Sequence, residues 1–151
     1  VTITDGSGLF YNHLEVLIVS DGCCNGNEWK AFDFSLIPCL RELQVGNHCF
    51  RWVKEVRMVE MNVLEKVVIG DVCFSSRENA VLVNAKNRFF LKDCVRLREL
   101  KIGSNCFNDY SVCEIENVPF LEVMEVGRLN RSGTSFYHAT LELKSDSERM
   151  K

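Results

Sequence analysis

A seven-residue pattern of leucine, two variable residues, an apolar residue, a variable residue, isoleucine or valine, and glycine occurs five times along the chain. The five copies begin at Leu14, Leu40, Leu64, Leu97 and Leu121. In the first copy, Ser20 takes the place of the glycine. Apolar residues that alternate with other residues are typical of a β-strand with one buried face. The pattern therefore predicts five short strands, one in each of five repeats.

A two-residue motif begins three positions after the glycine position. In the first four copies it reads Cys23-Cys24, Cys49-Phe50, Cys73-Phe74 and Cys106-Phe107. The fifth copy departs from the rule, with Asn130-Arg131 at this spacing. We interpret the motif as a corner after the first strand. The glycines suit positions that need a positive φ or a close backbone approach.

A second alternating apolar pair precedes each following leucine by eight and six residues. These pairs are Phe32/Phe34, Val56/Met58, Phe89/Leu91 and Cys113/Ile115. Leu141/Leu143 continues the series, and we expect Val1/Ile3 to be its counterpart at the start. Each repeat is thus predicted to contain a first strand, a turn, a corner, a second strand and a return. A single repeat cannot bury its apolar side, so the repeats are expected to stack into a solenoid.

The repeat resembles the leucine-rich repeat, particularly the BspA-like subclass of bacteria and protists, in which a short strand precedes a corner of a small residue and a phenylalanine. The resemblance covers about residues 14–127. It implies an arc with a parallel sheet on the concave side, short second strands on the other side, and a role in protein recognition. This chain departs from the longer repeats of the family because it lacks their asparagine-ladder position.

The third repeat is longer than the others. The leading leucines are 26, 24, 33 and 24 residues apart, and the extra residues lie in 75–87. We interpret this insertion as a protruding loop or hairpin. No linker-like tract divides the chain, so residues 1–151 are predicted to form a single domain. The residues at the two ends suggest a fragment of a longer protein.

The composition argues against two classes of partner. The net charge is −3 and both signs are interspersed, whereas nucleic-acid binding calls for a clustered basic face. The apolar stretches are far shorter than the roughly 20 residues of a membrane helix, so we expect no membrane insertion by this segment. The eight cysteines allow disulfides. Their repeat positions instead favour small buried hydrophobes, and hence a reduced protein in the cytoplasm.

Candidate chemistry is sparse. Zinc ligands could come from Cys23, Cys49, Cys73 and His48, but no Cys-x-x-Cys pair supports such a site. His48 and Cys49 are neighbours in sequence, so along a strand they would point to opposite faces and could not act as a nucleophile pair. We therefore expect no catalytic residue, no metal and no cofactor. A metal-binding protein or a thiol enzyme is kept only as a remote alternative.

The predicted first strands place residues in columns across the sheet. The buried columns are expected to be Leu17, Leu43, Val67, Leu100 and Met124, and Val19, Val45, Ile69, Ile102 and Val126. Two outward columns read Glu15, Arg41, Glu65, Arg98 and Glu122, and Val16, Glu42, Lys66, Glu99 and Val123. Acid and base are neighbours in both, so we expect them to pair across strands. The third outward column, in contrast, is not expected to pair within itself. It consists of Ile18, Gln44, Val68, Lys101 and Glu125.

The third column supplies the candidate partner-binding surface. Val16 of the second column is added to it. The candidates are therefore Val16, Ile18, Gln44, Val68, Lys101 and Glu125. Apolar residues on an outer sheet face can mark a recognition surface. The predicted function is a non-catalytic protein–protein interaction module whose partner is another protein. The alternative is a structural spacer or capping segment of a larger repeat protein.

Overall fold

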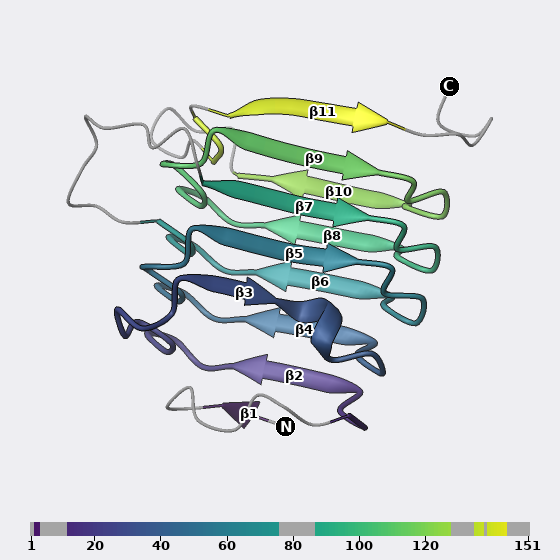
Figure 1. Ribbon diagram of the computed structural model, residues 1–151, viewed down its shortest axis with the longest axis horizontal. Helices are drawn as coiled ribbons and strands as arrows, with labels where there is room; N and C mark the ends of the chain where they lie inside the picture. The colour runs from purple at the N-terminus through teal and green to yellow at the C-terminus, as the bar shows by residue number, and fades with distance from the viewer. Residues whose placement is uncertain (1, 4–11, 76–86, 128–134, 138, 145–151) are drawn as a thin grey trace.

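The chain winds as a β-solenoid-like coil with almost no helix. The computed structural model describes residues 2–3, 12–75, 87–127, 135–137 and 139–144. Strands of one sheet point one way across the molecule and those of the other sheet point the opposite way, so each turn of the coil crosses both layers (Figure 1). The mainly β solenoid with parallel sheets, predicted from the repeats, is confirmed.

The first sheet contains all five predicted first strands and one more. Its order is β1 (Thr2–Ile3), β2 (Val16–Val19), β4 (Glu42–Val45), β6 (Lys66–Ile69), β8 (Glu99–Ile102) and β10 (Val123–Val126). Every neighbouring pair is parallel. Leu43 pairs with Leu17 on one side and with Val67 on the other. Equivalent repeat positions are therefore in register, as the columns require.

The second sheet is formed by the second strands of the repeats. These strands are β3 (Ala31–Asp33), β5 (Glu55–Val59), β7 (Arg88–Lys92), β9 (Val112–Glu116) and β11 (Thr140–Lys144), again all parallel. Phe34 was expected in the first of these strands but begins a short 3-10 helix, η1 (Phe34–Leu36). The Asp33 side chain accepts a hydrogen bond from the Ser35 N–H at 3.0 Å, which favours this turn over an extended strand.

The expected place of the N-terminal pair was wrong. We expected Val1/Ile3 to belong to the series of second strands. Instead β1 pairs with β2 in the first sheet, with Thr2 opposite Ile18 and Ile3 opposite Val19. Val1 itself lies outside the described residues. Alternation indicates which side of a strand is buried, but it does not indicate to which of two sheets the strand belongs.

Side chains from both sheets and from the corners form one apolar core. A stack of aromatic rings runs through it from repeat to repeat. Phe50, Phe74, Phe107 and Phe136 follow one another with centroid distances of 4.8, 4.8 and 4.6 Å and nearly parallel planes. The last member shows that Ser135-Phe136 forms the fifth corner. Asn130-Arg131, the pair at the expected spacing, lies outside the described residues.

A ladder of side-chain oxygens links the turns after the first strands. Oδ1 of Asp21 accepts from the Asn47 N–H at 2.7 Å, and Oδ1 of Asn47 accepts from the Asp71 N–H at 2.7 Å. Oδ1 of Asp71 then accepts from the Ser104 N–H at 2.8 Å. We expected the chain to lack the family's asparagine ladder. It nevertheless has an Asp/Asn ladder of its own, one residue after the glycine position.

The buried columns hold in four repeats and fail in the fifth. Leu100 and Ile102 on β8 are 0% and 3% exposed, whereas Met124 and Val126 at the same positions of β10 are 38% and 42% exposed. The expectation that both columns are buried throughout is therefore wrong at β10. The physical reason is position: β10 is the edge strand of the first sheet as the described residues form it, so no further strand covers it.

Candidate functional site

The outer face of the first sheet carries the charge pairs expected from the sequence. Arg41 lies 2.9 Å from Glu65, and Arg98 lies 3.2 Å from Glu122, within the first outward column. In the second column, Lys66 lies 3.5 Å from Glu99. The hydrogen bond from Arg41 to Glu65 raises the pKa of the guanidinium. These charges already interact with one another across neighbouring strands.

An uncharged patch lies on the N-terminal half of this face. Ile18, Gln44 and Val68 are direct neighbours on β2, β4 and β6, and all three are partly exposed. Val16, two residues before Ile18 on the same face, is 36% exposed. The structure thus brings four of the six candidate residues together. We call these four residues the neutral patch.

The other two candidates belong to a charge cluster. The Lys101 ammonium lies 2.9 Å from Glu99 and 3.8 Å from Glu125. Its pKa is raised, first by the hydrogen bond to Glu99 and then by the charge of Glu125. The expectation that the third column does not pair within itself is therefore wrong for Lys101 and Glu125. Glu99 lies two residues before Lys101, hence on the same face, where the long lysine side chain reaches it.

The corner cysteines act as small hydrogen-bond donors to the preceding repeat. The thiols of Cys49, Cys73 and Cys106 donate to the carbonyl oxygens of Ser20, Gly46 and Gly70 at 3.1, 2.9 and 3.0 Å. In the fifth corner the Ser135 hydroxyl donates to the Gly103 carbonyl oxygen at 2.6 Å. A serine can replace the cysteine in this ladder, so the position requires a small donor rather than a thiol.

The environments of four buried thiols raise their pKa and favour the neutral form, whereas the hydrogen bond with Cys73 lowers the pKa of Cys106. Seven of the eight cysteines are buried. The hydrogen bond to Cys106 is the first cause that raises the pKa of Cys73 to about 12, and burial contributes as well. Burial is the main cause that raises the pKa of Cys94 to about 11 and that of Cys113 to about 12. A neutral, enclosed thiol is a poor nucleophile.

The residues considered for zinc do not form a site in the structure. His48 is exposed in a turn with a φ of 57°, and the Cys49 thiol donates to a backbone carbonyl. Over the described ranges, no group of three or more His, Cys, Asp or Glu side chains is placed to hold a metal ion. Nor does this part of the chain contain a helix long and apolar enough to span a membrane.

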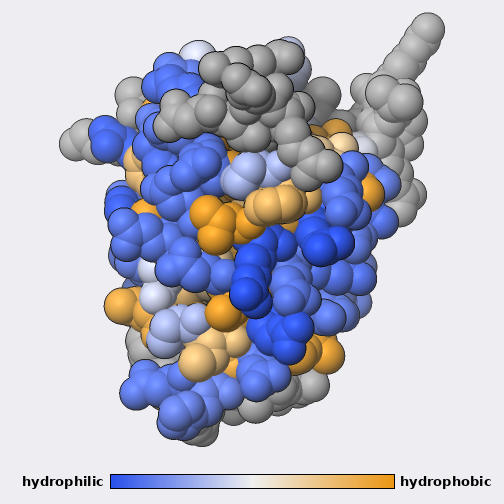
Figure 2. Space-filling view, turned by 90° about the vertical axis from the view of Figure 1, so that its right-hand side faces the viewer, coloured by the Kyte–Doolittle hydropathy of each residue, from blue (hydrophilic) through white to orange (hydrophobic). Residues whose placement is uncertain are grey.

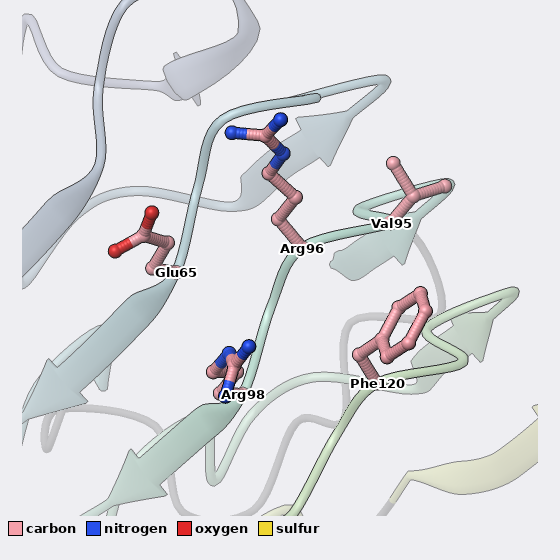
Figure 3. A pocket seen from close by; sticks show the side chains of 5 residues that line it. All are labelled: Glu65, Val95, Arg96, Arg98 and Phe120. Atoms are coloured by element: carbon pink, nitrogen blue, oxygen red, sulfur yellow. The ribbon is translucent and has the colours of Figure 1, made fainter.

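A shallow hollow that the sequence did not reveal lies where the returns meet the first strands. It has a volume of about 290 Å³ and is lined by Glu65, Val95, Arg96, Arg98 and Phe120. Val95 and Phe120 lie on one side of the hollow and Glu65 lies on the other (Figure 3). Figure 2 views this edge and shows apolar groups between strongly hydrophilic ones. Phe120 is 50% exposed, and a phenylalanine directly before a leading leucine was the available signal.

Comparison with known proteins gives no further guide. No protein-family model, curated protein or solved structure matches this chain.

Proposed function

We propose that this β-solenoid is a non-catalytic protein-interaction module that binds a protein partner with the outer face of its first sheet. The observation that carries the proposal is the neutral patch of Val16, Ile18, Gln44 and Val68. It lies beside charges that pair with one another on the same face. The finer assignment, a leucine-rich-repeat arc of the BspA-like type with this sheet on its concave side, is part of the same proposal.

The neutral patch is suited to an interface for a physical reason. Aliphatic side chains that are partly exposed release water without breaking an existing ion pair. Strands about 4.8 Å apart place three neighbouring side chains within about 10 Å. Interfaces concentrate their binding energy in a few such clustered residues. Arg41 and Glu65 would instead have to give up part of their mutual attraction before they could pair with a partner. The sheet supplies a rigid frame for the patch.

A photo-crosslinking test identifies the partner and the face together. A photoreactive amino acid replaces Val68 in one sample and Val112, on the second sheet, in the other. We expect one protein to crosslink at position 68 and not at position 112. Binding of that protein is then measured by calorimetry. Ile18→Asp and Val68→Asp should each weaken it by about tenfold or more, because a buried carboxylate replaces an apolar contact.

The matched control exchanges the charges of Arg41 and Glu65 on the same face. Their side chains are 51% and 36% exposed, so the exchange should leave the melting curve and the affinity nearly unchanged. Loss of binding on this exchange, with no effect of Ile18→Asp or Val68→Asp, would assign recognition to the charged columns instead.

One observation favours the spacer alternative. Met124 and Val126 leave the core open at β10, whereas the terminal repeat that caps a solenoid has a polar outer face. Among the described residues, this end therefore lacks the polar face of a cap, which favours a spacer over a capping segment. If neither the neutral patch nor the charged columns affect binding of any crosslinked protein, the spacer role replaces our proposal.

A further inference from the structure

The last described turn of the coil ends in an open strand edge. The apolar positions that are buried in the inner turns are exposed at this edge. Met124 and Val126 are 38% and 42% exposed on β10, and Leu143 is 52% exposed on β11. Ile115, which is paired with Leu143 in the second sheet, is 2% exposed. In the described part of the chain, β10 and β11 are edge strands of the two sheets. Such an edge is a template for another strand.

Carbonyl oxygens on this edge match those that join the inner repeats. The Glu122 N–H donates to the Arg98 carbonyl oxygen at 2.9 Å, and the Gly127 N–H, five residues later, donates to the Ile102 carbonyl oxygen at 2.8 Å. The same two bonds join each of the three preceding pairs of repeats. On the last turn the equivalent acceptors are the carbonyl oxygens of Glu122 and Val126. Within the described ranges, no backbone N–H from a following repeat donates to either of them.

The charge at this edge selects among possible occupants. The first and third outward columns end in Glu122 and Glu125, whose side chains are 64% and 63% exposed. Glu122 pairs with Arg98, just before β8, and Glu125 lies 3.8 Å from Lys101 on β8. Each acid is the last residue of its column, so a strand added beyond β10 would meet an acid in both columns. A second copy joined through its own β10 would add the same two acids to this surface. Like charges on neighbouring strands destabilise a sheet, whereas lysine or arginine would continue the alternation.

We propose that β10 binds a basic, strand-forming segment of a partner protein, which adds to the first sheet as a parallel strand. The segment has apolar residues at the two alternate positions beside Met124 and Val126. It has lysine or arginine beside Glu122 and Glu125. Two of its N–H groups, five residues apart, donate to the carbonyl oxygens of Glu122 and Val126. This surface is separate from the neutral patch and does not depend on the function proposed for that patch.

The chain itself supplies a probe with this chemistry. A peptide with the sequence of residues 96–104 carries Arg98, Leu100, Lys101 and Ile102 at the required spacing. Its binding to the full chain is measured by fluorescence anisotropy, and amide NMR signals report the place of binding. We expect the signals of Val123–Val126 to shift and those of the neutral patch to stay in place.

Matched variants make the test specific. A control peptide with Arg98→Glu and Lys101→Glu should bind at least tenfold more weakly than the basic peptide. A protein with Glu122→Lys and Glu125→Lys should instead prefer the acidic peptide. Val126→Asp should weaken binding at least tenfold, and its exposure lets the fold tolerate the change. Val68→Asp, on the neutral patch, should not affect the peptide.

Three outcomes would overturn the proposal. The first is no binding of the basic peptide at millimolar concentration. The second is equal binding of the basic and acidic peptides, which would remove the charge argument. The third is a dimer of the chain, detected by sedimentation and abolished by Val126→Asp. This result would make a second copy the occupant. None of these results bears on the crosslinking test of the neutral patch.

Discussion

At the scale of single residues, the turn before each corner cysteine requires a left-handed backbone. The equivalent residues Gly22, His48, Val72 and Asn105 have φ values of 72°, 57°, 59° and 57°. Glycine adopts this region freely and asparagine tolerates it, whereas a β-branched side chain is strained there. The repeat imposes the same conformation on all four residue types. Of the four, Val72 is therefore the residue at which sequence and backbone conflict most.

Replacing Val72 with asparagine should stabilise the protein. We expect Val72→Asn to raise the free energy of unfolding by about 1 kcal/mol, because the left-handed conformation costs a side chain of this kind roughly that amount. The measurement is urea denaturation followed by circular dichroism. The matched control, Asn105→Val at the equivalent position of the next repeat, should lower the free energy of unfolding by a similar amount. Equal stability of both variants and the wild type would mean that the turn is not strained at Val72.

At the scale of the repeat element, the glycine after the first strand has a steric role. A Cβ on Gly70 would lie 2.5 Å from Oδ1 of Asn47 and 2.8 Å from the carbonyl carbon of Gly46. Gly46 and Gly103 meet the neighbouring turn at similarly short distances. The backbones of successive turns approach this closely because the Asp/Asn ladder joins them. The glycine therefore permits this close approach of successive turns.

Substitution of Gly70 should test this steric role. We expect Gly70→Ala to lower the free energy of unfolding by about 1–3 kcal/mol, the usual effect of overpacking, since backbone atoms must move. The control is Gly22→Asn, where φ is 72° and a Cβ would have no described atom within 4 Å, so little change is expected. Thermal melts of both variants provide the comparison. A Gly70→Ala variant as stable as Gly22→Asn would show that the turns can separate at little cost.

Periodicity explains which parts of the element were predictable. The alternation at Leu43/Val45 and Val56/Met58 located strands of both sheets, because one buried face leaves a period of two in the sequence. The Asp/Asn ladder was missed, since its members Asp21, Asn47 and Asp71 also read as ordinary turn residues. Ser135-Phe136 was missed because extra residues precede this corner and break the spacing. Neither feature leaves a periodic apolar signal.

At the scale of the whole molecule, the solenoid has no centre, and each repeat is stabilised mainly by its neighbours. The first-sheet strands of the inner repeats and of the last repeat have the same apolar pattern. The same burial was therefore predicted for Leu43 and Met124. The structure separates them, at 0% and 38% exposed. Part of the candidate site was likewise predictable, namely the neutral patch. The ion pairs of Lys101 depend on how far its side chain extends. An alignment of repeat positions does not show this.

The contrast between Leu43 and Met124 gives a test of the whole architecture. Leu43→Asp should abolish cooperative folding, because burial of an unpaired carboxylate costs several kcal/mol against a total stability of about 5–15 kcal/mol. Met124→Asp places the same group in the same column at the open end, where water reaches it, and should leave a cooperative melt close to that of the wild type. Circular dichroism melts of both variants decide the matter. If Leu43→Asp melts within a few degrees of the wild type, the register of the first sheet is wrong. If Met124→Asp unfolds the chain as completely as Leu43→Asp, the last repeat is part of the cooperative core, and its exposed apolar edge is not available to a partner strand.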